Sequence, residues 1–339
     1  MIPSQLRFDI VSKDWVVIAT GRGRRPGSFK KDTDTGWKED TKKFCPFEEI
    51  DKQERPLLTL VKGEEVEPVK GKYVPDNWTA VSLPNKYPAF SPKGSLAKKK
   101  KGPYTVMDGV GYHEVLITKD HKKDIPQFSL AQTRELIELY YKRFMALRKE
   151  KGVKYISLFK NKGKTAGASL AHPHSQMIAI PVTDPDIERS LRGSKEYYHE
   201  NKECVHCVML DWDRKDKKRI VFENEHFIAV CPFASRIAFE IRIYPKRHSA
   251  YFEQINEEER DALAETFSKT LKKFHKALND PDYNYFLHSA PFDGRDNDHY
   301  HWHWEILPRS SIWAGFEWGT GIEISTIEPE KAAAYLRKQ

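Results

Sequence analysis

The sequence predicts an α+β protein whose two similar halves, residues 1–185 and 186–339, share one largely antiparallel sheet with helices packed against it. Two observations lead to this class. The same order of cysteine and histidine landmarks occurs twice along the chain. In each half, a segment with the apolar period of a helix lies between short apolar segments typical of strands. We therefore expect each half to contain a strand, a helix and two further strands, in that order.

In each half, a cysteine motif is followed by a lone histidine and then by two histidines that are separated by one residue. These landmarks are Cys45, His121, His172 and His174 in the first half, and Cys204, Cys207, His248, His301 and His303 in the second. Nearly the same number of residues separates the lone histidine from the pair in both halves. Landmarks that recur in the same order and at the same spacing indicate an internal repeat.

Each lone histidine is followed by a predicted helix with a capped start. Ser129 and Asn256 are residues that favour the N-cap position, and Gln132 and Glu259 stand three residues later, where a capping box needs them. Apolar residues then recur every three or four positions, which is the period of one helix face. Both helices are therefore expected to bury one face against the sheet.

Short apolar segments flank each predicted helix. The strands that they predict cover residues 114–118, 153–159 and 172–181 in the first half, and 239–243, 283–287 and 301–307 in the second. Because successive side chains of a strand point to opposite faces, His172, His174 and Gln176 would share one face. Residues 183–203 are expected to form the linker between the halves.

The composition excludes several classes of protein. Hydrophobic residues make up 39% of the 339 residues and aromatic residues 12%, which is too much for a disordered chain. No apolar run approaches the length of a membrane helix, and the N-terminal segment lacks the apolar core of a secretory signal. Four cysteines do not make a disulfide framework in so long a chain, so we expect a cytoplasmic protein in which paired cysteines bind metal and Cys231 belongs to the core.

The net charge of +8 is compatible with nucleic acid, with polyanionic small molecules or with a lysine-rich surface. The most basic run, Lys98–Lys101, contains no aromatic residues and is expected to be an exposed loop. A zinc-containing nucleic-acid-binding protein would need a basic stripe with stacking aromatic residues, which the sequence lacks. We therefore expect no nucleic-acid partner.

The spacing of the second cysteine motif predicts a metal site. Cys204 and Cys207 stand three residues apart, a spacing at which two thiolates can bind one tetrahedral zinc ion. The repeat supplies His248 and His301 as the two remaining ligands. In the first half, Glu48 occupies the position of the second cysteine.

Two interpretations stay open for the first half. In one, Cys45, Glu48, His121 and His172 also bind zinc, because a carboxylate oxygen is an acceptable zinc ligand. In the other, this half has lost its metal and keeps His172 as a hydrogen-bonding residue.

The segment 161–176 contains the residues that nucleophilic catalysis at phosphorus requires. A neutral imidazole can attack a phosphorus atom and form a phosphoramidate, which divides one difficult displacement into two steps. Asn161, Ser169 and Gln176, with the backbone N–H groups of a glycine-rich loop, can donate to the phosphoryl oxygens. Two of the arginines in the motif Arg22-Gly-Arg24-Arg25-Pro could add bidentate phosphate contacts.

The motif His172-Pro-His174-Ser-Gln176 resembles the active-site signature of galactose-1-phosphate uridylyltransferases, a branch of the histidine-triad superfamily. The likeness extends over nearly the whole chain, including the closing segment 315–321. It implies two tandem histidine-triad-like halves, with His174 as the nucleophile and His172 as a metal ligand. It also implies a homodimer that exchanges residues across its interface, and no organic cofactor.

The resemblance further assigns residues to the parts of the substrate. The implied phosphate contacts are Asn161, Ser169, Gln176, Arg22 and Arg25, the implied nucleoside pocket contains Phe47, Asn85 and Tyr87, and the implied hexose contacts are Phe316 and Glu317. Phe316 stands where the family usually has a tyrosine. Some members carry iron at the second site, and here Glu188, His288, His301 and His303 could mimic that ligand set.

The function implied by the resemblance is a ping-pong reaction in which UDP-glucose and galactose-1-phosphate give glucose-1-phosphate and UDP-galactose through a uridylyl-histidine. The closing segment, and the serine that follows His174, also resemble the ADP-glucose phosphorylase branch, which passes an adenylyl group to phosphate. Hydrolases of the histidine-triad type use a third histidine where this motif has Gln176, so transfer to an acceptor other than water is favoured.

Overall fold

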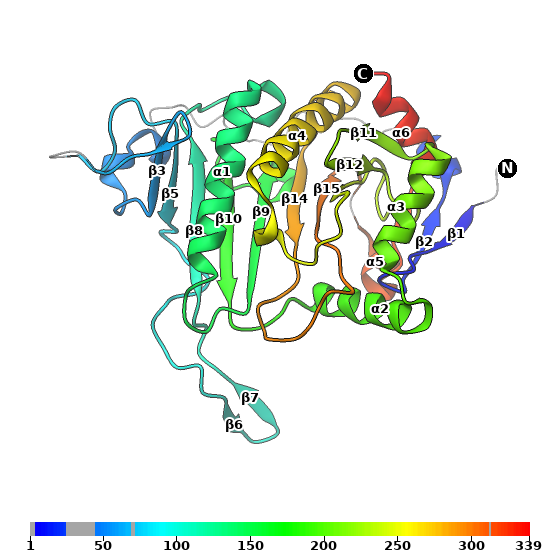
Figure 1. The fold of residues 1–339 in the computed structure, drawn as a ribbon, viewed down its shortest axis with the longest axis horizontal. Coiled ribbons are helices and arrows are strands. Elements are labelled where there is room, and N and C mark those ends of the chain that lie inside the picture. The colour runs from blue at the N-terminus through cyan, green and yellow to red at the C-terminus, as the bar shows by residue number, and fades with distance from the viewer. Residues whose placement is uncertain (1–3, 25–44, 69–71, 312) are drawn as a thin grey trace.

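The computed structural model describes residues 4–24, 45–68, 72–311 and 313–339. It confirms the predicted α+β class, because strands of both halves form one antiparallel sheet with helices against it (Figure 1). Strands of the second half occupy one side of this sheet and strands of the first half the other. The halves join where Tyr283 pairs with Lys162 and Phe286 with Phe159.

In spatial order, the strands of the large sheet are β11 (Ile220–Glu223), β12 (Phe227–Val230), β13 (Ile241–Pro245), β15 (His303–Pro308), β14 (Tyr283–His288), β9 (Tyr155–Lys162), β10 (His174–Ile180), β8 (Tyr112–Thr118), β5 (Ala80–Pro84), β3 (Leu58–Val61) and β4 (Glu64–Glu65). A smaller sheet contains β1 (Gln5–Phe8), β2 (Trp15–Ile18) and β16 (Ile324–Ser325).

Two long helices, α1 (Leu130–Leu147) and α4 (Glu257–Leu278), lie across one face of the large sheet (Figure 1). Both predicted capping boxes are confirmed, because the side chains of Ser129 and Asn256 accept from the backbone N–H groups three residues later. The predicted apolar stripes are buried in a single core with the sheet, where Phe144 and Phe267 are fully enclosed. Cys231 also lies in this core, as expected.

The segment between the halves, residues 183–203, is largely helical, because most of it forms α2 (Pro185–Asn201). Asp184 caps this helix by accepting from two backbone N–H groups, and proline follows at the first helical position. Ile187 and Leu191 are buried. A Cβ atom on Gly193 would lie 1.9 Å from the Val11 carbonyl oxygen, so glycine is required where the N-terminal segment packs on the helix.

Three further helices follow: α3 (Val205–Asp216), α5 (Gly315–Thr320) and α6 (Pro329–Arg337). The lysine run forms β6 (Lys99–Lys101), which pairs with β7 (Tyr104–Val106) in a hairpin that protrudes from the body (Figure 1). It is exposed, as predicted, but it is a hairpin rather than a loop. Among the described helices, none combines the length and the apolar character needed to cross a bilayer.

The strands that carry the histidine pairs begin later than predicted. His172 and His301 precede β10 and β15, whereas His174 and His303 are their first residues. On β10, Ser175 and Met177 face the core beneath α1. His174 and Gln176 therefore face the opposite side of the sheet, which the long helices leave uncovered.

Candidate active site and metal centres

His174 is held in the tautomer that a nucleophile needs. Its Nδ1 lies 2.9 Å from the backbone carbonyl oxygen of His172, and since a carbonyl only accepts, Nδ1 carries the proton. The lone pair is therefore on Nε2. The side chain is 7% exposed, and burial lowers the pKa of His174 below its usual value, which favours the neutral imidazole.

Two of the predicted phosphate donors lie beside His174. Asn161 is one residue beyond the last paired positions of β9 and β10, Lys160 and Ser175, and so stands next to His174 across the ladder. Gln176 is two residues along β10 and shares the face of His174. Ser169 is exposed in the loop between these strands.

The predicted nucleoside residues extend from His174 towards β5. The Phe47 ring meets the His174 ring edge-on, with the centroids 5.5 Å apart. The backbone N–H of Asn85 donates to the His113 carbonyl oxygen on the neighbouring strand β8. Tyr87 lies on an exposed turn and is 82% exposed.

The structure does not bring the predicted hexose residues to His174 within one chain. Phe316 and Glu317 lie on α5, near α2 and β2 and away from β10 (Figure 1). Phe316 is 49% exposed, and the Glu317 carboxylate accepts from the backbone N–H of Ala314 at the start of its own helix. Arg22 follows β2 in the same region, whereas Arg25 lies outside the described residues.

The four side chains of the first predicted metal set are brought together. Candidate ligand atoms of Cys45, His121 and His172 lie within 4.8 Å of one another. Glu48 Oε1 lies 2.8 Å from His121 Nδ1 and 3.7 Å from His172 Nδ1. The Cys45 sulfur is 3.6 Å from His172 Nδ1, while the other nitrogen of this ring donates to the Thr118 carbonyl oxygen.

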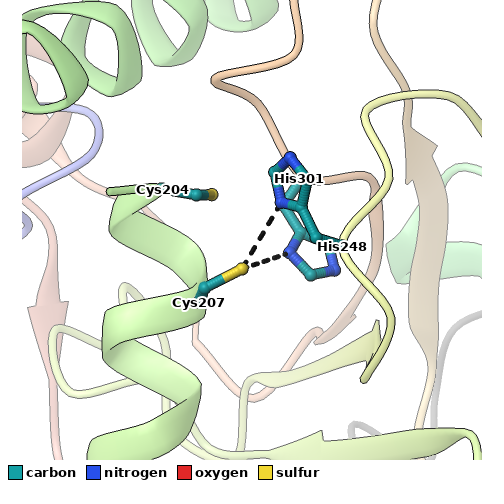
Figure 2. Close-up of side chains that lie close together, drawn as sticks. All are labelled: Cys204, Cys207, His248 and His301. Atoms are coloured by element: carbon teal, nitrogen blue, oxygen red, sulfur yellow. Dashed lines mark hydrogen bonds between the residues drawn. The ribbon is translucent and has the colours of Figure 1, made fainter. Parts of the chain in front are cut away.

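The second set is also assembled. Cys204 and Cys207 lie at the start of α3. The imidazole rings of His248 and His301 face them from two other segments of the chain (Figure 2). The Cys207 sulfur is 3.4 Å from His248 Nδ1 and 3.5 Å from His301 Nδ1. Both histidines donate through Nε2 to backbone carbonyl oxygens, so each Nδ1 faces the sulfurs. Such outer hydrogen bonds fix the orientation of metal-binding imidazoles.

The two sulfurs of the second set are unequal as acids. The hydrogen bond from Cys207 lowers the pKa of the Cys204 thiol far below its usual value, because it stabilises the Cys204 thiolate. The same pairing raises the pKa of Cys207, because its proton is shared with the Cys204 thiolate. A cation bound between the two sulfurs would remove this difference in pKa, because both thiols could then lose their protons and bind the cation as thiolates.

The alternative iron-like ligand set is not assembled. The Glu188 carboxylate is paired instead with Arg295, at 2.5 and 3.0 Å, on the surface. His288, which is half-buried, lies instead beside the buried residues His303 and Glu305.

In the second half, the position equivalent to His174 is closed by other side chains. His303 Nδ1 is 3.0 Å from the His301 carbonyl oxygen, which repeats the arrangement of His174. Its ring stacks on Tyr244, and Glu305, the counterpart of Gln176, is buried in ion pairs with Arg236 and Arg242. Because the ion pairs keep this carboxylate ionised and an ionised carboxylate can only accept, it offers no donor to a phosphoryl oxygen.

Two polar residues near the site were missed by the sequence analysis. His113 contacts Gln176, and Asn284 contacts Asn161. Both stand within apolar strand segments, where a polar side chain on the open face was the available signal. Their partners depend on strand register, which the sequence alone does not specify.

Comparison with known proteins then decides the family. Residues 2–183 match the family model described as galactose-1-phosphate uridyl transferase, N-terminal domain, which is more than half of the chain. The chain belongs to this family. Residues 109–338 also match a model described only as a domain of unknown function.

Relatives of two named activities resemble the whole chain. An ADP-glucose phosphorylase from Arabidopsis thaliana is 32% identical, over 98% of this chain and 92% of the relative. A galactose-1-phosphate uridylyltransferase from Thermotoga maritima is 30% identical, over 98% of both chains. As a member of this family, the protein is a nucleotidyltransferase.

Solved structures agree with this assignment. The crystal structure of an ADP-glucose phosphorylase from Arabidopsis thaliana with bound ADP-glucose matches with a TM-score of 0.81 at 29% identity, covering 99% of both chains. A uridylyltransferase structure matches with a TM-score of 0.72 at 29% identity, covering 83% of this chain and 97% of that one.

Proposed function

We propose that the protein is a galactose-1-phosphate uridylyltransferase that works through a uridylyl-histidine. His174 Nε2 attacks the α-phosphorus of UDP-glucose, a P–N bond forms, and the bond to glucose-1-phosphate breaks. A phosphate oxygen of galactose-1-phosphate then attacks the same phosphorus, and UDP-galactose leaves as the P–N bond breaks. The observation that supports this most strongly is the His174–His172 hydrogen bond, which leaves the Nε2 lone pair beside Asn161 and Gln176.

A second candidate is phosphorolysis of ADP-glucose by the same chemistry. Phe316 lacks the hydroxyl group that the uridylyltransferases usually place at the hexose, and relatives of both activities cover the chain equally well. In this reaction the adenylyl group passes from His174 to inorganic phosphate, giving ADP.

The deciding experiment separates the two half-reactions. The protein is mixed with UDP-glucose or ADP-glucose and its intact mass is measured, with His174→Gln as the control that cannot form the adduct. The labelled protein is then given galactose-1-phosphate or phosphate. A uridylyl adduct consumed by galactose-1-phosphate supports the first candidate, and an adenylyl adduct consumed by phosphate supports the second. No adduct with either donor contradicts both.

We propose that zinc occupies both metal sets. Two thiolates and two imidazoles suit tetrahedral zinc at Cys204, Cys207, His248 and His301, and the first set offers one thiolate, two imidazoles and a carboxylate. The first set has a direct link to the nucleophile, because the carbonyl group of His172 orients His174. Zinc would supply structural rigidity there. The free thiols favour a reducing, cytoplasmic location.

We further propose a homodimer in which each active site is completed by the other chain. Arg22 follows β2, and Phe316 and Glu317 lie on α5, which precedes β16, the partner strand of β2. Figure 1 shows α5 and β2 away from β10, which carries His174. In the dimer, the hexose would be bound by Phe316 of the partner subunit and Glu317 of the partner subunit. The implied small-molecule partners are a nucleotide sugar and a hexose-1-phosphate, with no nucleic acid and no membrane.

A further inference from the structure

Two amide side chains beside His174 each have their carbonyl oxygen occupied by a neighbouring donor. We propose that His113 and Asn284 are positioning residues, which turn the NH₂ groups of Gln176 and Asn161 towards the transferred phosphoryl group. An amide presents donors at one end and an acceptor at the other, so its orientation decides whether it stabilises or repels a phosphoryl oxygen. This proposal rests on the proposed nucleotidyl transfer at His174.

The orientation of Gln176 follows from the tautomer of His113. The backbone N–H of Ala89 donates to His113 Nδ1 at 3.1 Å, so Nδ1 holds a lone pair. Burial lowers the pKa of His113, and the neutral ring therefore carries its proton on Nε2. This proton points to Gln176 Oε1, 2.8 Å away. The Nδ2 of Asn85 lies 3.1 Å from the same nitrogen, and because both atoms are donors in this tautomer, their approach is a contact and not a hydrogen bond.

The orientation of Asn161 follows from a chain of fixed donors. Arg309 donates through Nε to Asn284 Oδ1 at 2.6 Å, and a guanidinium group can only donate. The Nδ2 of Asn284 must then face the other way, where it donates to Asn161 Oδ1 at 2.7 Å and to the Ala166 carbonyl oxygen at 2.8 Å. Asn284 is 7% exposed, so water does not replace these bonds. The NH₂ group of Asn161 is left for another acceptor.

The second half of the chain thereby supports chemistry that takes place in the first. Asn284 lies on β14 and Arg309 directly follows β15. The carboxylate of Asp282, just before β14, accepts from the backbone N–H and the hydroxyl group of Thr165 in the glycine-rich loop. The half whose own histidine position is closed thus holds Asn161 and the glycine-rich loop of the other half in place.

Asn284→Asp is the sharpest test of this orientation, because it keeps the shape and replaces the donor by an acceptor. The Asn161 amide would then turn its NH₂ group towards the new carboxylate and its oxygen towards the phosphoryl group. We expect the rate of adduct formation to fall roughly 100- to 1,000-fold, the usual effect of losing one transition-state donor. The KM for the nucleotide sugar should change much less.

His113→Phe provides the corresponding test for Gln176. It keeps a planar ring but removes the donor, and we expect a loss of about 10- to 100-fold in rate, as for outer partners of other site residues. Asn224→Asp is the matched control, because Asn224 is another hydrogen-bonded asparagine of the second half, beside β11 at the far edge of the sheet. Its rate of adduct formation should stay near that of the wild type, even if its melting temperature falls.

Double-mutant cycles separate positioning from a general structural effect. If Asn284 acts through Asn161, adding Asn284→Asp to Asn161→Ala should cost less than threefold further rate. Likewise, if His113 acts through Gln176, adding His113→Phe to Gln176→Ala should cost less than threefold further rate. Losses that multiply in full in both cycles would overturn the proposal, because independent sites behave additively in free energy.

A measurement without turnover distinguishes failure of this proposal from failure of the proposed function. In ¹⁵N NMR of the full-length protein, the signals of His113 are assigned by their loss in His113→Phe. We expect a protonated Nε2 and an unprotonated Nδ1. The opposite tautomer would overturn the positioning role even in an active enzyme, whereas an inactive wild type with the expected tautomer would contradict only the nucleotidyl transfer.

Discussion

His174 is fixed by one backbone hydrogen bond, and its contribution can be tested directly. We expect His174→Gly to abolish adduct formation, because it removes the imidazole whose Nε2 lone pair is set by the His172 carbonyl group. The side chain is buried, so the change also removes packing and should lower the melting temperature by a few degrees without unfolding the protein. Intact-mass measurement and thermal unfolding check the two effects. Normal turnover by this variant would rule out the covalent mechanism.

Gln176 should affect rate rather than choice of sugar. Losing one donor to a phosphoryl oxygen in a preorganised site costs about 2.7–4 kcal/mol, or roughly 100- to 1,000-fold in rate. We expect Gln176→Ala to slow both half-reactions by about this factor, with a smaller effect on affinity for the nucleotide sugar. Rates with different hexose-1-phosphates test this. A near-normal rate combined with a changed hexose preference would show that Gln176 faces the sugar.

Single residues also show where sequence reasoning ends. The sequence analysis predicted a neutral imidazole as the nucleophile, and the structure shows what holds it in the required tautomer, the carbonyl group of His172. The partners of Gln176 and Asn161 were not predicted, because His113 and Asn284 reach them through strand register rather than through a motif. Short motifs identify groups that react, whereas the groups that orient them lie at distant positions in the chain.

At the scale of elements, each set of proposed metal ligands connects segments that are distant in the sequence. Cys204 precedes α3, so the second set joins the start of this helix to segments after β13 and before β15. We expect Cys204→Ser to remove one equivalent of zinc and to cost about 4 kcal/mol or more, the range associated with loss of a structural metal. Glu48→Ala should cost less, because the carboxylate of Glu48 is partly exposed.

Zinc content and melting temperature of the two variants give the comparison. Equal losses from Cys204→Ser and Glu48→Ala would show that the two sets are equally important for stability, contrary to our ranking.

A helix or strand could be predicted where the residues that determine it lie close together in the sequence. The helices after Ser129 and Asn256 were predicted with their caps, because capping boxes and apolar periods are contained within one segment. Helix α2 was missed although Asp184 and Pro185 mark its start, because its polar exposed face resembles a linker. The strands after His172 and His301 began late because these two residues turn towards the metal sets.

At the scale of the whole molecule, the separation of Phe316 and Glu317 from His174 makes a subunit-mixing experiment decisive. Chains with His174→Gly and chains with Glu317→Ala should each be inactive alone. When they are coexpressed, mixed dimers contain one site with both residues intact, so activity should return. Wild-type chains paired with chains that carry both changes provide the control, provided that the mixed dimers are first purified away from wild-type homodimers through different tags on the two chains, since these mixed dimers have no intact site. Activity in the purified control dimers and none in the first mixed dimers would place both residues in one chain's site.

The pairing of β14 with β9, which joins the two halves, bears on how a chain of two similar halves could have arisen. Cutting the protein there would leave each half with a bare strand edge, whose unpaired N–H and C=O groups invite another strand to dock. Two copies of a single half, docked edge to edge, would rebuild a continuous sheet of the same kind. The present chain holds such a pair in one polypeptide, and an edge residue of the second half, Asn284, contacts Asn161 in the site of the first.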